Sequence, residues 1–140
     1  MALTNIVSCM NLNISLTNMT LEQAQLDGIA PWDNLVKDQP MVAVYLDRYP
    51  CTPGHRLYVP KQNDNANWIV TAMEEALLDG NHLVKTGECD GFNIGYNSGT
   101  VAGQTVMYPH VHLIPRRAGD VEDPVGGVRN TIPGKGNYKK

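Results

Sequence analysis

The segment from Gly91 to Arg117 constrains the fold more than any other part of the sequence. Two runs rich in apolar residues, Gly91–Asn97 and Val106–Ile114, flank a loop of small and polar residues. Runs of this length on either side of a Gly-rich loop are typical of two strands joined as a hairpin. We therefore expect an antiparallel pair whose loop lies beside the second strand.

Two histidines in the second run, His110 and His112, alternate with apolar residues. If the run is a strand, its period of two places Tyr108, His110 and His112 on one face, with the histidine Cα atoms roughly 7 Å apart. The small residues of the preceding loop would let backbone N–H groups approach an anion closely. This arrangement predicts an anion site.

Metal binding is the alternative function for a His-x-His pair, which is common in zinc and iron sites. A metal would need a third ligand, and the remaining histidines are His55 and His82. Cys9, Cys51 and Cys89 form no C-x-x-C pair, which favours reduced thiols over a zinc site or a disulfide framework. We expect no catalytic metal and no required cofactor, although a divalent ion could arrive bound to substrate phosphates.

Length and charge narrow the class of protein. A chain of 140 residues predicts one domain. A net charge of −3 argues against a partner that is a nucleic-acid backbone. The sequence shows no apolar run of the roughly 18–20 residues that a membrane span needs and no signal-peptide layout. We therefore expect a cytoplasmic protein without a membrane partner.

Periodicity predicts the remaining elements. A capping Thr20 predicts a short helix that ends before Pro31. The strongest helical pattern covers Asn65–Leu78. Gly80 is expected to end that helix, and the alternative that His82–Lys85 adds a further turn before Gly87 stays open. Strands or turns are expected in three further runs: Trp32–Gln39, Met41–Leu46 and His55–Val59. Together these elements predict an α+β fold with a mainly antiparallel sheet of about five strands and one long helix.

The sequence from Gly103 to Arg116, GQTVMYPHVHLIPR, resembles the signature of the histidine-triad (HIT) nucleotide hydrolases and transferases. That signature is His-φ-His-φ-His preceded by Gly-Gln-Ser/Thr-Val, where φ is an apolar residue. Tyr108 stands in place of the first histidine. Further resemblance is found at Asp47, which corresponds to the ribose-binding acid, and at Pro53–Lys61, which corresponds to the segment P-x-G-H-x-L-V-x-P-K.

The Gly119–Arg129 segment resembles the tail of bacterial dinucleoside polyphosphate hydrolases of the same family. The resemblance implies a HIT-like domain over residues 32–140, preceded by an N-terminal extension, residues 1–31, of unknown role. It also implies a homodimer that pairs sheets and helices about a twofold axis.

The resemblance implies a role for each candidate site residue. His110 would attack the α-phosphorus while its other ring nitrogen binds the backbone carbonyl of His112, and His112 would contact the bridging oxygen. Asp47 would bind the ribose and Tyr45 would line the base pocket. Four further residues would bind the phosphate: Asn97, Gly103, Gln104 and Thr105. Two would support the site, His55 and Tyr108.

The function implied is hydrolysis or transfer at the α-phosphate of purine nucleotides, with dinucleoside polyphosphates favoured, through a nucleotidyl-histidine intermediate. Two alternatives use the same residues. One is a catalytically weak nucleotide-binding sensor or scaffold, favoured by Tyr108 because a phenol does not titrate near neutral pH. The other is a nucleoside phosphoramidase.

Overall fold

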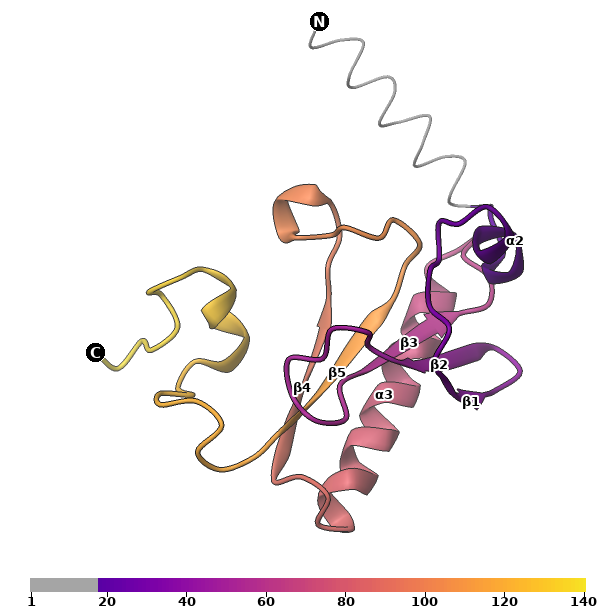
Figure 1. Cartoon of the computed structure of the whole chain (residues 1–140). Coiled ribbons are helices and arrows are strands. Elements are labelled where there is room, and N and C mark those ends of the chain that lie inside the picture. The colour runs from indigo at the N-terminus through magenta and orange to yellow at the C-terminus, as the bar shows by residue number, and fades with distance from the viewer. Residues whose placement is uncertain (1–17) are drawn as a thin grey trace, which may run out of the picture.

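The computed structural model describes residues 18–140, and Figure 1 shows how the elements are arranged. The helices are α2 (Leu21–Leu26) and α3 (Asn67–Lys85), with short 3-10 helices η1 (Thr100–Ala102) and η2 (Gly127–Thr131). The strands are β1 (Leu35–Asp38), β2 (Val42–Leu46), β3 (Arg56–Pro60), β4 (Gly91–Tyr96) and β5 (Val111–Arg116). Residues 1–17 of the expected N-terminal extension lie outside the described residues.

The five strands form one sheet in the order β1-β2-β3-β5-β4, and every neighbouring pair is antiparallel. The predicted α+β fold with one long helix is confirmed. After β3 the chain passes through α3 to β4, which is an edge strand. It then returns along β5, which lies between β3 and β4 in the sheet (Figure 1). His112 of β5 thus pairs with Leu57 of β3 on one side and Gly95 of β4 on the other.

The long helix α3 covers one face of the sheet with small residues, Ala72 and Ala76, that pack on buried strand residues. The helix does not end at Gly80, the first of the two ends that the sequence offered, but continues to Lys85, as the alternative predicted. A Cβ atom at Gly80 would lie 2.8 Å from the ring of Phe92. The glycine therefore allows the β4 side chain to approach the helix and does not terminate it.

The other face of the sheet is covered at the β2 and β3 end by α2 and the chain that follows it. Thr20 caps α2 as predicted, since its hydroxyl oxygen accepts the N–H of Gln23 at 3.1 Å. A second buried cluster forms here from α2, β2, β3 and the chain before β5: Leu21, Ala24, Ala30, Ala43, Tyr45, Leu57, Val59 and Tyr108. None of the helices within residues 18–140 has the length and hydrophobicity that a membrane crossing requires.

Strand β5 begins at Val111, five positions later than the sequence predicted, and residues 106–110 are irregular. Pro109 cannot donate to a strand ladder because it lacks an N–H. Tyr108 turns into the second cluster and is fully buried. The prediction that Tyr108 and His110 share a strand face with His112 was therefore wrong, although the rings of His110 and His112 still meet at a centroid distance of 5.1 Å.

Candidate active site

His110 lies at the entry to β5, where it is almost completely buried. Its Nδ1 atom is 2.8 Å from the backbone oxygen of Tyr108. A carbonyl oxygen can only accept, so Nδ1 carries the hydrogen and Nε2 keeps a lone pair in the neutral ring. The acceptor is the carbonyl two residues before His110 and not that of His112, which corrects the expectation from the resemblance. Burial lowers the pKa of His110 and favours this neutral form.

His112 is oriented by a chain of hydrogen bonds that starts at a backbone amide. The N–H of Cys51 donates to Nδ1 of His55 at 3.2 Å, so Nδ1 of His55 carries no hydrogen. The hydrogen of neutral His55 is then on Nε2, which lies 2.8 Å from Nδ1 of His112. His112 must accept there, and its own hydrogen is on Nε2. That Nε2 atom is buried and has no hydrogen-bond partner among the described residues.

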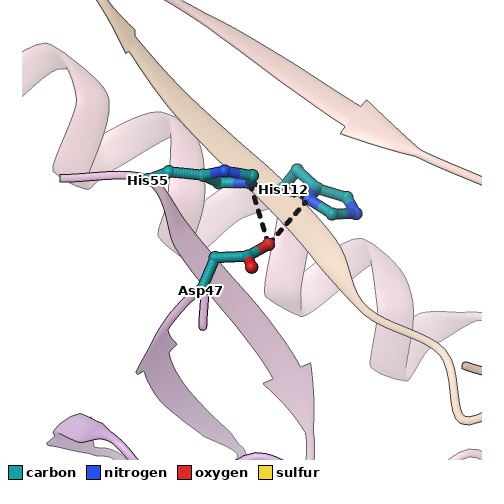
Figure 2. A group of neighbouring side chains, drawn as sticks. All are labelled: Asp47, His55 and His112. Carbon is teal, nitrogen blue, oxygen red and sulfur yellow. Dashed lines mark hydrogen bonds and ion pairs between the residues drawn. The ribbon is translucent and has the colours of Figure 1, made fainter. Parts of the chain in front are cut away.

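Asp47 completes this group, as Figure 2 shows: one carboxylate oxygen lies 3.4 Å from Nε2 of His55 and 3.9 Å from Nδ1 of His112. Its other oxygen accepts the N–H of Tyr49 at 2.8 Å. Burial lowers the pKa of His112 to about 4, and the positive charges that His110 and His55 carry when they are protonated lower it in the same direction. Burial also lowers the pKa of His55, against the opposing effect of Asp47. All three histidines are therefore neutral near pH 7.

The ligand atoms of Asp47, His55 and His112 all lie within 4.8 Å of one another, a spacing that a divalent metal could use. The hydrogen bonds argue against such a site. Nδ1 of His55 already accepts the N–H of Cys51, so a metal at Nε2 would require either an imidazolate or the loss of that hydrogen bond. The donor set does not fit a resident metal ion.

The loop before β5 holds its shape through Gln104 and Gly103. The side chain of Gln104 accepts the N–H of Gly99 at 2.8 Å and donates to the carbonyls of Val106 and Met107 at 3.2 and 3.1 Å. Gly103 adopts the left-handed conformation, with φ at 89°, and its N–H donates to the carbonyl of Thr100. The side chain of Gln104 and the N–H of Gly103, two predicted phosphate-binding groups, are therefore already hydrogen-bonded within the loop.

The other two predicted phosphate-binding residues, Asn97 and Thr105, make no side-chain hydrogen bond within residues 18–140. Both line a cavity of about 300 Å³ together with His110 and His112. A cavity of this size fits part of a nucleotide. The structure thus brings Asn97, Thr105 and both histidines to one space with open hydrogen-bonding capacity.

The same cavity contains Asp47 and Trp32, but Tyr45 does not line it. Tyr45 is buried in the second cluster, and its hydroxyl accepts a hydrogen bond from Gln25 at 2.8 Å. The Trp32 ring instead lies 4.8 Å from that of His110, centroid to centroid. Trp32 was not among the predicted site residues, and its only signal in the sequence is an aromatic side chain directly after Pro31.

An α+β fold with a neutral histidine pair, buried at His110 and half-buried at His112, in one cavity with the side chains of Asn97 and Thr105 is the arrangement of a class of nucleotide-processing proteins. The family model for the HIT domain matches residues 31–119. Adenylylsulfatase HINT3 of Arabidopsis thaliana is 34% identical over 99 residues, which are 66% of this chain and 50% of that protein. An uncharacterised HIT-like protein of Methanocaldococcus jannaschii is 32% identical over 106 residues, covering 69% of this chain and 78% of the relative. The chain belongs to the HIT family of nucleotide-processing proteins.

Another relative and a solved structure agree with membership of the HIT family. The AP-4-A phosphorylase of Mycobacterium tuberculosis is 34% identical over 87 residues, 57% of this chain and 45% of that enzyme. The chain therefore spans about half the length of the two named enzymes that it matches. Among solved structures, a Zn-bound histidine triad family protein from Mycobacterium smegmatis has a TM-score of 0.60 at 29% identity, covering 69% of this chain and 74% of that one.

Proposed function

We propose that the protein hydrolyses or transfers nucleotides at the α-phosphate, with dinucleoside polyphosphates of purines as the preferred substrates. The observation that carries the proposal is the pair of opposite tautomers in the site. Nε2 of His110 has a lone pair and Nε2 of His112 has a hydrogen. A nucleophile and a hydrogen-bond donor are thereby placed side by side in one cavity.

The reaction proceeds in two displacements. In the first, Nε2 of His110 forms a bond to the α-phosphorus, and the bond from phosphorus to the bridging oxygen breaks. The remaining polyphosphate leaves as an anion, while Nε2–H of His112 donates a hydrogen bond to an oxygen of the transferring phosphate group. In the second, water attacks phosphorus, the nitrogen–phosphorus bond breaks, and a nucleoside monophosphate is released with a proton lost to solvent.

The protonation state of His112 favours anionic leaving groups. A group with a pKa of about 4 is neutral near pH 7, so His112 donates a hydrogen bond but has no extra proton to transfer. A polyphosphate leaves without being protonated, whereas the amine of a phosphoramidate needs a proton. The site therefore supports anhydride cleavage over the phosphoramidase alternative. The names of two relatives, an adenylylsulfatase and an AP-4-A phosphorylase, support an adenine nucleotide as substrate.

The nucleoside of the attacked phosphate is assigned to the end of the cavity where Trp32 and Asp47 lie. An indole offers a stacking surface for a base, and a carboxylate can accept bonds from ribose hydroxyls. Asp47 would turn one oxygen from the histidines toward the ribose when nucleotide binds. The side chains of Asn97 and Thr105 would bind the non-bridging phosphate oxygens.

Mass spectrometry of the intact protein tests the proposal. Wild type and His110→Ala are mixed with diadenosine tetraphosphate and quenched rapidly. The quench contains no acid, because acid would cleave a phosphorus–nitrogen bond. We expect a mass increase of one adenylyl group in wild type only, with adenosine monophosphate released. The nucleotide affinity of His110→Ala should stay within roughly tenfold of wild type, because the donors remain. Tight binding with neither adduct nor product would establish the sensor alternative instead.

A further inference from the structure

A second and larger cavity, of about 750 Å³, lies on the face of the sheet opposite α3, between the strands and the C-terminal tail. Its floor comes from Gly95 of β4 and Ile114 of β5. The tail, residues 118–131, supplies a wall through Val121, Pro124 and Val128. In Figure 1 this tail, drawn in yellow, runs beside β4 and away from α2. The cavity is large enough for a nucleoside.

The two cavities meet at the reactive centre. His112 and Asn97 line both of them, whereas His110 lines only the smaller one. In a displacement at phosphorus the attacking and leaving groups are roughly in line on opposite sides. When His110 attacks, the leaving group therefore lies on the opposite side of phosphorus, toward His112. The larger cavity is the space beyond His112.

The charges of the larger cavity make it a poor site for phosphate. Arg116 is its only Lys or Arg among the described residues, and it binds Asp120 through two nitrogens at 2.7 and 2.8 Å. Arg116 also donates to the side-chain oxygen of Asn93 at 2.8 Å. A second carboxylate, that of Asp123, lines the wall. An incoming phosphate would meet no unpaired cation and two acidic groups.

The same lining suits a neutral planar group. Ile114, Val121 and Val128 offer aliphatic surfaces, and the amides of Asn93 and Asn130 offer polar groups at the rim of these surfaces. A nucleobase has two apolar faces and polar edges, which is the complementary pattern. Inorganic polyphosphate and sulfate have no apolar face.

The tail that forms the wall is held in a defined conformation. Arg129 donates from Nε to the carbonyl of Gly136 and from Nη2 to that of Lys135. Gly126 has φ at 95°, and a Cβ atom there would collide with the backbone of Gly136. The segment that forms the wall therefore keeps its shape through contacts within the tail itself.

We infer that the larger cavity binds the second nucleoside of a dinucleoside polyphosphate, on the leaving side of the attacked phosphate. The inference rests on the proposed function for its choice of ligand. It assigns recognition of the second nucleoside to the C-terminal tail, and it distinguishes a dinucleotide from a mononucleotide that carries the same number of phosphates.

Calorimetry on the His110→Ala background, where no turnover interferes, tests the inference. The ligands are diadenosine tetraphosphate and adenosine 5′-tetraphosphate, which differ by one nucleoside and share the phosphate chain. We expect the dinucleotide to bind roughly tenfold more tightly. Adding Val128→Trp, which fills the cavity from an exposed position, should reduce that ratio to about twofold or less. Leu26→Trp, at an exposed position on α2 that does not line the cavity, is the matched control and should keep it.

Equal affinities for the two ligands in the starting protein, or a ratio that Val128→Trp leaves unchanged, would overturn the inference. Val128→Asp provides an independent variant at the same exposed position, because it replaces an aliphatic surface against the base with a hydrated charge and should also abolish the advantage of the dinucleotide. Failure of the proposed function gives a different result. In that case wild type forms no adenylyl adduct and releases no product, whatever the ratio of affinities.

Discussion

Nε2 of His55 lies 2.8 Å from Nδ1 of His112, and the backbone N–H of Cys51 determines which of the two rings donates. We propose that His55 is a positioning residue: it would act on a bound phosphate only by holding the hydrogen of His112 on Nε2. A backbone N–H can only donate, so it determines the tautomers of His55 and His112 without ambiguity. The substitution of His55 is expected to change the tautomer of His112 before it changes substrate binding.

His55→Ala should lower kcat at least about tenfold with little change in KM, because the donor to the phosphate is lost in part while the binding groups remain. His55→Gln should recover much of the loss, since its amide nitrogen can donate where Nε2 of histidine does. Nitrogen NMR of the imidazoles should show His112 with its hydrogen on Nε2 in wild type and His55→Gln, and a mixture in His55→Ala. His82→Ala, on α3, is the control. Equal kinetics for the alanine and glutamine variants would contradict a positioning role.

The free energy of unfolding should fall as the pH falls below about 6.5. Burial lowers the pKa of His55, His110 and His112 in the folded state, that of His112 to about 4. Between pH 6.5 and 4 the unfolded chain binds protons that the folded chain does not, so stability rises with pH across this window. Each such histidine contributes a slope of at most about 1.4 kcal/mol per pH unit, reached where it is fully protonated in the unfolded chain and fully neutral in the fold.

Urea unfolding at several pH values measures this slope. His112→Asn removes one buried histidine, and the loss of stability between pH 6.5 and 4 should be smaller in that variant. A pH dependence that is the same in His112→Asn and wild type would show that His112 is protonated in the folded state over this range.

The hydroxyl of Tyr108 donates to the carbonyl of Pro60 at 2.7 Å, and the side chain is fully buried. Tyr108→Phe should destabilise the fold by about 1–3 kcal/mol, because a buried carbonyl loses its partner. It should leave kcat nearly unchanged, since the acceptor for His110 is the backbone oxygen of residue 108. Thermal unfolding and kcat measure the two effects, with Tyr138→Phe, an exposed tyrosine, as control. A large loss of kcat without a loss of stability would place the phenol in the reaction.

The resemblance alone predicts that Tyr108→His leaves activity unchanged or raises it. The structure changes that expectation, because an imidazole is smaller than a phenol and would leave space in the second cluster as well as the Pro60 carbonyl without its partner. We expect Tyr108→His to be less stable than Tyr108→Phe. The carbonyl of residue 108 should still orient His110 in any variant that folds.

Local signals in the sequence were sufficient for much of the fold. The Thr20 cap, the Met41–Leu46 strand and the period of α3 each depend on residues close together in the chain. Local signals offered two ends for α3, Gly80 and the turn before Gly87, and did not decide between them. Gly80 ends no helix because Phe92, which is distant in sequence, needs the space above it. A contact between an element and the next strand overrides the local preference of a glycine.

In the site, too, features that depend on neighbouring residues were predicted and those that depend on distant loops were not. The alternation of His110 and His112 identified the histidine pair, but the partner of each ring depends on loops that the sequence does not place. Pro109 delays the start of β5, so the carbonyl of Tyr108 and not that of His112 meets His110. The amide of Cys51 carries no sequence signal at all, because every residue except proline has one.

A homodimer is the last property that the resemblance implies, and the structure offers a surface for it. Strand β4 is an edge of the sheet, and α3 packs against it. The outer side of α3 exposes Val70, Leu77 and Leu78 at helical spacing. An open edge strand beside an apolar stripe is a surface that a second copy can cover. Leu78→Asp would place a charge in that contact.

Sedimentation equilibrium should give a dimer for wild type and a monomer for Leu78→Asp, because a buried unpaired carboxylate costs several kcal/mol at an interface. Leu26→Asp, an exposed leucine on α2, is the matched control and should remain dimeric. The residues of the active site all come from the loops and strands of one chain, so the monomeric variant should still form the adenylyl adduct. A dimer that persists in Leu78→Asp would show that the contact lies elsewhere, and a variant that is monomeric and has lost the adduct would show that the second copy supports the site.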